Sequence, residues 1–349
     1  MIANSTSLNR IWIVADEFPK LGDKSPDWEV GMQEWESKDS IELLASTVQE
    51  LEYIVQIIYS PKDLLDKLAN LSKEERSLLT VWNLVEGIGS RNRESYIPGI
   101  CEYFGINCIG SDSYAQIISL DKNLTSTVSR TLGIPVANEI KIDAFTELQD
   151  LQSLSGVEKY FVKPNGEGSS IGIYESSIQN SFEEAIVLSE KMRSQFPNLL
   201  IQEFLPGEEY TVCLLQEDFE KWKIASAQVI PPNQIYGSDI KVKDSMPEKI
   251  EFRIDKKIKN EIEKMSLKLI QHLTAEGYAR VDWKIDFFGK PKLLECNLTP
   301  GLSKIYSLFP KIFDQGVGIN YKNLIDKMIT VSNINYKQKS RYHYGKKFF

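Results

Sequence analysis

The amino-acid sequence predicts an α/β protein in three parts: an N-terminal parallel-sheet domain, a central α+β lid domain and a C-terminal domain. In the first third, apolar runs of strand length alternate with amphipathic helical segments, which is typical of β-α-β units and a parallel sheet. After about residue 140, strands follow one another across short turns. The 349 residues also exceed one typical domain. We expect domains at 1–120, 121–205 and 206–335, followed by a basic tail at 336–349.

The N-terminal elements follow from local patterns. Apolar residues between 38 and 51 recur at helical spacing, and Ser37 precedes them as an N-cap. Gly105 is a C-cap signal for a helix that ends near Phe104. We expect strands at 11–15, 54–59, 78–84 and 106–109. Helices are expected at 38–51, after Pro61, before Gly105 and over 112–132.

The later elements surround a Gly/Ser-rich segment, Asn165–Gly172. It follows a strand at 160–163 and returns through Ile173 and Tyr174, which predicts a hairpin with a mobile tip. The segment 231–247 lacks periodicity and predicts a long loop of the kind that acts as a lid. Further strands are expected at 199–205, 210–215, 223–229, 278–286 and 292–297. Helices are expected at 181–194, 255–275 and 319–331, before a disordered tail.

The composition excludes several classes of function. Net charge −8 and a pI near 5.2 argue against nucleic acid as a partner, since phosphate binding needs a positive field. No apolar run approaches 18 residues, so no membrane span is expected. The four cysteines form no CxxC pair, and with only two histidines His-based catalysis is not expected. We expect a reduced, cytoplasmic protein that works with carboxylates, lysines, backbone amides or metal.

Two strands carry alternating charged and polar residues. Arg280 and Asp282 share one face of the first strand, and Glu295 and Asn297 share one face of the second. Buried carboxylates need compensation. It could come from Arg280 alone, or from magnesium together with a triphosphate, because magnesium prefers oxygen ligands. The pattern favours the metal interpretation.

Other segments offer phosphate and nucleotide contacts. Lys163 ends a strand just before the Gly/Ser segment, whose backbone N–H groups and hydroxyls could cover a polyphosphate. The spacing is not that of a P-loop, and a Gly/Ser hairpin alone is more often a flexible turn. Lys122 is a second candidate phosphate ligand, or a surface lysine. The strand and hinge from Gln202 to Glu209 could present backbone groups to adenine and a carboxylate to ribose.

The order of these features resembles the ATP-grasp superfamily and, within it, the D-alanine–D-alanine ligases. The resemblance covers roughly residues 80 to 330 and is carried by four segments. They read EYFGINCIGSDSYAQIISLDK, VKPNGEGSSIGI, RVDWKID and LLECNLTPGLS. The resemblance implies an ATP-grasp fold. It also implies a ligase that forms an acyl phosphate from a small carboxylate and joins the acyl group to an amine, with a possible role in peptidoglycan synthesis. Two Mg²⁺ ions, with Mn²⁺ as an option, and a homodimer as an option are also implied.

The resemblance assigns roles residue by residue. Lys122 and Lys163 would bind ATP phosphates under a covering loop of Glu167, Gly168, Ser169 and Ser170. Gln202, Glu203 and Leu205 would contact adenine, and Glu209 would contact ribose. Asp282, Glu295 and Asn297 would hold the metal ions. Arg280 and the amide of Gly301 would stabilise the oxyanion, with Ser169, Lys241 and Glu36 also at the catalytic site: Lys241 on phosphate and Glu36 on the first substrate's ammonium.

Several departures from the family pattern bear on the substrates. Val242 stands where the family has a tyrosine after the loop lysine, which predicts an acceptor bulkier or less polar than D-alanine. The segment 300–307 is one residue longer than the family's PGMTSHS, and residues 83–89 (NLVEGIG) replace its HG-x-x-GEDG. Two alternatives stay open: an ATP-grasp ligase of specialised metabolism with another acid and acceptor, and a nucleotide-binding protein without turnover. Intact Arg280, Asp282 and Glu295 argue against the second.

Overall fold

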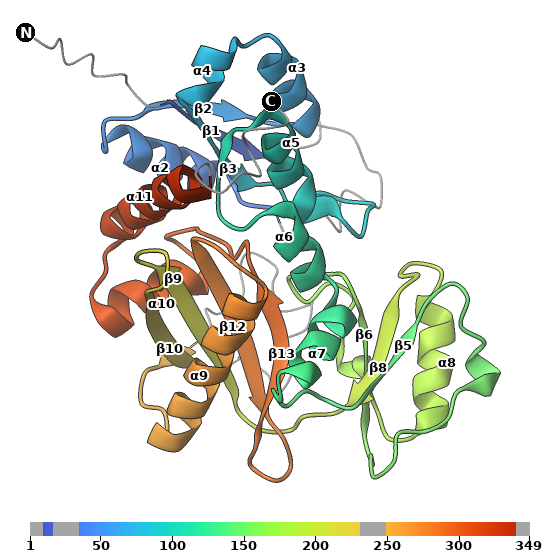
Figure 1. The fold of residues 1–349 in the computed structure, drawn as a ribbon. Helices are drawn as coiled ribbons and strands as arrows, with labels where there is room; N and C mark the ends of the chain where they lie inside the picture. Colours follow the sequence, from blue (N-terminus) through green and yellow to red (C-terminus); the bar gives the residue numbers. More distant parts are fainter. Residues whose placement is uncertain (1–9, 17–34, 231–248, 340–349) are drawn as a thin grey trace, which may run out of the picture.

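The computed structural model describes residues 10–16, 35–230 and 249–339, and in these ranges three sheets organise the chain (Figure 1). The first is parallel, and the other two consist of antiparallel pairs. Each sheet draws its strands from one of the three expected segments. The predicted loop at 231–247 lies outside the described residues. The fold class predicted from the sequence is therefore confirmed, whereas the domain boundaries stay a prediction.

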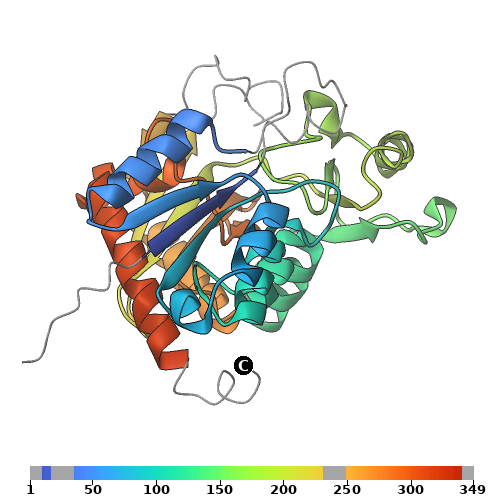
Figure 2. The ribbon, with the colours of Figure 1, turned by 90° about the horizontal axis from the view of Figure 1, so that it is seen from above.

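The N-terminal sheet has the strand order β2-β1-β3-β4. Helices cover both of its faces, with α2 and the last helix, α11 (Tyr321–Lys339), on one side (Figure 2). Ser37 is the N-cap of α2, as predicted, and Gly105 ends α5 with φ 66°. The strands are β1 (Arg10–Ala15), β2 (Ile54–Ile58), β3 (Leu79–Leu84) and β4 (Asn107–Ile109). The helices are α2 (Lys38–Gln49), α3 (Pro61–Ala69), α4 (Lys73–Ser77), the short 3-10 helix η1 (Arg93–Ser95) and α5 (Tyr96–Phe104).

The single helix predicted over 112–132 is wrong, because the chain forms two helices there. These are α6 (Ser113–Leu120) and α7 (Lys122–Thr131). Asp121 between them is extended, and its carboxylate accepts a hydrogen bond from Leu124 N at 2.9 Å, so it is the N-cap of α7. The break makes Lys122 the first residue of a helix and directs it towards the second sheet, where its backbone N–H contacts the carbonyl of Asn165.

The second sheet has the order β5-β8-β6-β7 and carries α8 on one side. The predicted return strand at Ile173 and Tyr174 is wrong: the chain turns tightly there, and the antiparallel partner of β6 comes later, at 178–179. Gly172 explains the turn, since its φ is +72° and a Cβ would lie 2.7 Å from the ring of Pro164. The elements are β5 (Glu139–Ile142), η2 (Leu148–Asp150), β6 (Tyr160–Pro164), η3 (Glu175–Ser177), β7 (Ile178–Gln179), α8 (Phe182–Met192) and β8 (Leu199–Glu203).

The third sheet has the order β11-β10-β9-β12-β13. Helix α9 covers one face, and two helices that follow the sheet in sequence pack against the other. Helix α10 was not predicted from the sequence, and α11 is longer than predicted, so residues 336–339 of the expected tail are helical. The strands are β9 (Glu209–Gln216), β10 (Trp222–Ile230), β11 (Lys249–Glu251), β12 (Tyr278–Ile285) and β13 (Pro291–Asn297). The helices are α9 (Lys256–His272), α10 (Leu308–Val317) and α11 (Tyr321–Lys339).

One buried core joins the beginning and the end of the chain. Ile11 and Ile13 of β1 belong to the same cluster as Cys213 of β9 and Leu324 and Met328 of α11. The second sheet has a core of its own with α8. Within the described ranges, no helix is long and apolar enough to cross a bilayer.

Candidate active site

Pairing between β12 and β13 brings four predicted residues onto one face of the third sheet. Arg280 lies opposite Asn297 and Asp282 lies opposite Glu295 in the register. Neighbours in the alternation, such as Val281 and Trp283, point into the core under α9. The shared faces that the alternation predicted are thus found, and they lie on the side of the sheet opposite α9.

The Arg280 guanidinium ties the two carboxylates of this face together. It lies 2.9 Å from Asp282 Oδ2 and 3.5 Å from Glu295 Oε1. Thr211 of β9 donates a further hydrogen bond of 2.8 Å to Asp282 Oδ1. Burial nevertheless raises the pKa of Asp282 to about 6, because desolvation outweighs the arginine and Glu295 adds repulsion. The protonated form of Asp282 is thus favoured mainly by its burial, although Arg280 contacts both carboxylates.

Two lysines approach this face from other elements. Lys122 Nζ lies 3.4 Å from Glu295 Oε2 and donates to the carbonyl of Glu167 at 2.5 Å. Lys163, on β6, is buried, and its pKa falls from 10.5 to about 8. Desolvation is the main cause and repulsion by Lys122 the second, while Glu295 and Glu139 oppose them. Two cations forced this close together, with solvent excluded, form a site that attracts a polyanion.

The Gly/Ser segment turns back over these lysines in a conformation that L-residues rarely adopt. Ser169 and Ser170 have φ of 47° and 62°, each with a cost of about 1–2 kcal/mol. Turn hydrogen bonds from Ile171 N to the carbonyl of Gly168 and from Ile173 N to that of Ser170 hold the shape. Such consecutive left-handed residues form a concave loop whose N–H groups are suited to anions.

The predicted adenine and ribose segment joins the second sheet to the third. The backbone N–H of Glu203 donates to Asn138 O and that of Phe204 to Lys159 O, both at 2.9 Å. These two N–H groups are therefore already bonded within the protein, and the side chains of Gln202 and Leu205 are buried. The carboxylate of Glu209 lies 3.4 Å from Lys284 Nζ.

Glu36 is placed against the segment that follows β13. Its Oε1 accepts hydrogen bonds from Leu302 N at 2.8 Å and Ser303 N at 3.2 Å, and its Oε2 accepts one from the hydroxyl of Tyr306 at 2.7 Å. Gly301 leaves the room for this contact, since a Cβ there would lie 2.8 Å from Ser307 Oγ and 3.2 Å from Glu36 Oε1. The structure thus brings Glu36 and Gly301 together.

Several residues at this site escaped the sequence analysis. Arg93 contacts the Gly/Ser segment, Glu94 accepts a 3.0 Å hydrogen bond from Thr299, and Glu139 lies near Lys163. Desolvation raises the pKa of Glu139, against the pull of Lys163 and Asn123. A glutamate in the strand sequence EIKI gave no signal, and Tyr306 lies in the segment 300–307, where it was assigned no role. Lys241 lies outside the described residues.

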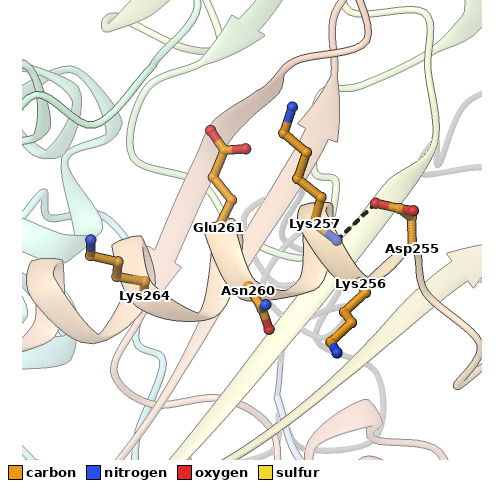
Figure 3. Close-up of a pocket in the computed structure, with 6 residues that line it drawn as sticks. All are labelled: Asp255, Lys256, Lys257, Asn260, Glu261 and Lys264. Atoms are coloured by element: carbon orange, nitrogen blue, oxygen red, sulfur yellow. Dashed lines mark hydrogen bonds between the residues drawn. The ribbon is translucent and has the colours of Figure 1, made fainter.

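A separate hollow on α9 does not belong to this cluster. Figure 3 shows that its side chains point to different sides of the helix, and the drawn hydrogen bond is the cap from Lys257 N to Asp255 Oδ1, at 2.9 Å. Helix α9 also covers the face of the sheet opposite the charged residues. Over the described ranges, no three His, Cys, Asp or Glu side chains are grouped as metal ligands. Any metal here would rest on Asp282, Glu295 and the amide oxygen of Asn297.

Solved structures have a similar overall fold. The D-alanine–D-alanine ligase of Bacillus anthracis, crystallised with ATP, has a TM-score of 0.71 at 21% identity and covers 95% of this chain and 99% of its own. The corresponding ligase of Coxiella burnetii has a TM-score of 0.71 at 16% identity, with 96% and 97% covered. These likenesses show the fold. The chain therefore has the ATP-grasp fold of these ligases.

Sequence comparison narrows the class. A family model described as the D-ala D-ala ligase C-terminus matches residues 129–330, more than half of the chain, and the chain belongs to this family. The D-alanine–D-alanine ligase of Aquifex aeolicus is 26% identical over 314 residues, which is 89% of this chain and 98% of that protein. The ligase of Acetivibrio thermocellus is 27% identical over 315 residues, 86% and 80% of the respective chains.

Proposed function

We propose that this ligase phosphorylates the carboxylate of D-alanine and transfers the resulting acyl group to the amine of a second small substrate. D-Alanine is the substrate in the names of the relatives. The observation that carries the proposal is the convergence of Lys122 and Lys163, from outside the third sheet, on the aligned face of Arg280, Asp282 and Glu295. For the acceptor we keep the expectation derived from Val242, which lies outside the described residues.

The first step is in-line phosphoryl transfer. A carboxylate oxygen of the acid attacks the γ-phosphorus of ATP, the bond to the bridging oxygen breaks, and ADP leaves. Lys122 and Lys163 provide positive charge along the phosphates, and the Gly/Ser segment with Ser169 covers them. Positioning and charge neutralisation supply most of the effect in such transfers. We also assign a phosphate contact to Lys241, and base and ribose contacts to the segment from Gln202 to Glu209.

The second step is attack on the acyl phosphate. The acceptor nitrogen, after losing a proton, adds to the carbonyl carbon, and the tetrahedral intermediate then expels inorganic phosphate. Arg280 and the N–H of Gly301 would stabilise the oxyanion. Arg280 is suited to this role because Asp282 and Glu295 keep it protonated: they raise its pKa against desolvation. Glu36, held at Gly301, would receive the ammonium of the first substrate.

The donor set fits magnesium. Two carboxylates and an amide oxygen on one face are hard oxygen ligands, which Mg²⁺ prefers. We propose two Mg²⁺ ions, replaceable by Mn²⁺, held by Asp282, Glu295 and Asn297 together with phosphate oxygens. The metal would neutralise charge on the transferred phosphoryl group. Dependence on ATP also favours a cytoplasmic location, and a homodimer is compatible with the proposal.

The test is ADP release by the full-length protein with D-alanine as the acid and a panel of acceptors. The panel contains D-amino acids, D-hydroxy acids and L-amino acids, each assayed with excess magnesium, and products are identified by mass spectrometry. We expect D-alanine-dependent ADP release and a D-alanyl product. No ADP release with any pair would contradict a turnover function. Efficient and selective D-alanyl-D-alanine formation would keep the function and refute the acceptor expectation.

A further inference from the structure

Arg93 lies just after residues 83–89, the stretch that departs from the family pattern, and it reaches the Gly/Ser segment from the N-terminal domain. Its Nη1 donates a 2.6 Å hydrogen bond to the carbonyl of Gly166, and its Nη2 lies 3.5 Å from Glu167 Oε2. Its side chain is 4% exposed. A buried guanidinium that binds both a carbonyl and a carboxylate of one short segment holds the position of that segment.

The surrounding loop fixes the position of Arg93. At the end of β1, the carboxylate of Asp16 accepts hydrogen bonds from Glu86 N at 2.8 Å and Gly87 N at 3.1 Å. Gly87 has φ +68°, and a Cβ there would lie 3.0 Å from Arg93 Cβ. Asn83 at the end of β3 donates to the carbonyl of Glu94 at 3.2 Å. The position of Arg93 is thus fixed by contacts from the ends of β1 and β3, the two central strands of the first sheet.

The segment that Arg93 contacts needs an anchor. Ser169 and Ser170 both occupy the left-handed region, and such strain persists only where neighbouring contacts enforce it. Lys122 holds the same segment through the carbonyl of Glu167, at 2.5 Å. Lys122 is also a proposed phosphate ligand, so once ATP is bound its ammonium is shared between the phosphates and the carbonyl of Glu167. Arg93 reaches the segment from the N-terminal domain and has no proposed phosphate contact.

We propose that Arg93 is a positioning residue that anchors the phosphate-covering segment 165–170 to the N-terminal sheet and thereby sets the affinity for ATP. The proposal rests on the proposed function. Arg93 keeps its contacts with Gly166 and Glu167 when ATP binds, so that the backbone N–H groups of the segment stay aligned with the phosphates. It does not bind phosphate itself.

The test compares Arg93→Met with Arg91→Met, an exposed arginine of the same loop. We expect Arg93→Met to raise KM for ATP about tenfold with a much smaller change in kcat at saturating ATP, because one charged hydrogen bond corresponds to about a factor of ten in affinity. Arg91→Met should leave both constants unchanged. Hydrogen exchange of 165–170 without nucleotide should become faster in Arg93→Met only. Unchanged KM and unchanged exchange would overturn the proposal.

Further variants separate anchoring from direct phosphate binding and from misfolding. Glu167→Gln removes one contact of Arg93. Under the proposal, the double variant Arg93→Met/Glu167→Gln therefore raises KM for ATP by less than the product of the two single effects. Fully multiplicative effects would overturn anchoring in favour of an independent phosphate contact. If Arg93→Met does not fold, Arg93→Lys serves, with an expected rise of a few-fold, since lysine cannot reproduce the two-pronged contact. Wild-type protein inactive with every substrate pair would instead refute the proposed function.

Discussion

Binding of ATP should weaken as pH rises above 8, because Lys163 loses its proton there in the free protein. Burial and the neighbouring Lys122 lower the pKa of Lys163 from 10.5 to about 8. This drop corresponds to about 3 kcal/mol by which the free site disfavours the ammonium. Bound phosphates supply the missing negative charge, so the pKa of Lys163 should rise towards its usual value in the complex.

The direction and size of the effect follow from linkage. Below pH 8 the ammonium is present in both states, and ATP binding takes up no proton. Above pH 8 the free protein holds neutral Lys163, and a proton must be bound together with ATP. Above pH 8 the affinity for ATP should then fall about tenfold per pH unit, or on the order of 30-fold in all between pH 7 and 9.5. ATP itself contributes little, since phosphate monoesters lose their second proton near pH 6, roughly. The free protein, in contrast, should gain stability between pH 8 and 10.5 as the buried charge disappears.

The assay is titration calorimetry with ATP and excess magnesium at several pH values, in buffers of different ionisation enthalpy. Proton uptake near pH 9 should approach one per ATP in the wild type. Lys163→Met should bind weakly and lose the pH dependence, while Lys159→Met, at an exposed position just before the same strand, should retain it. A wild-type affinity that is flat from pH 7 to 9.5, or the same slope in Lys163→Met, would refute this reasoning.

Three further changes test other parts of the site and fold. Glu295→Gln should lower turnover by roughly two to three orders of magnitude, because a carboxylate ligand is lost at nearly constant volume. Its circular dichroism spectrum should be unchanged. Near-normal ADP release at saturating magnesium would exclude the metal role of Glu295. Tyr306→Phe removes the 2.7 Å hydrogen bond to Glu36 and should raise KM for the acid about tenfold while KM for ATP stays constant. A rise in KM for ATP as well would argue against a role of Tyr306 confined to the acid site. Gly207→Ala places a Cβ 2.6 Å from a side-chain atom of β12 and should destabilise the protein by about 1–3 kcal/mol in thermal unfolding. The matched Gly166→Ala, where a Cβ meets no atom within 4 Å, should change stability little, and equal melting of the two variants would contradict the packing argument.

The sequence predicted those parts of the site that follow from local alternation. Arg280 and Asp282 are two residues apart on a strand, so their shared face could be inferred without any knowledge of the partner strand. Pairing of Asp282 with Glu295 could not be inferred, because a bulge between residues 282 and 283 shifts the register. The break at Asp121 was missed because apolar periodicity continues across it, although an Asp cap was available as a signal.

Contacts between distant segments set the limit of prediction. Arg93 and Gly166 are 73 positions apart, and Glu36 and Leu302 are 266 apart. No local pattern indicates that such residues meet, because their proximity depends on how three sheets pack. Helix α10 was missed for a different reason: Pro310 lies in its first turn, and proline is there compatible with a helix although it usually signals a break.

The shared core of β1 and α11 has a consequence for synthesis on the ribosome. Asn107 of β4 donates a hydrogen bond to Asn333 at 3.1 Å and accepts one from Ser332 at 3.0 Å. The first sheet is therefore completed by contacts with α11, the last helix to be synthesised. The part of the sheet's apolar face that α11 covers, beside α2, stays exposed until more than 200 further residues have emerged. At typical elongation speeds of about 5–20 residues per second, the nascent chain exposes this face for on the order of ten seconds or more. Nascent chains that lack α11 should accordingly be the species that chaperones bind, and completion of that helix should release them.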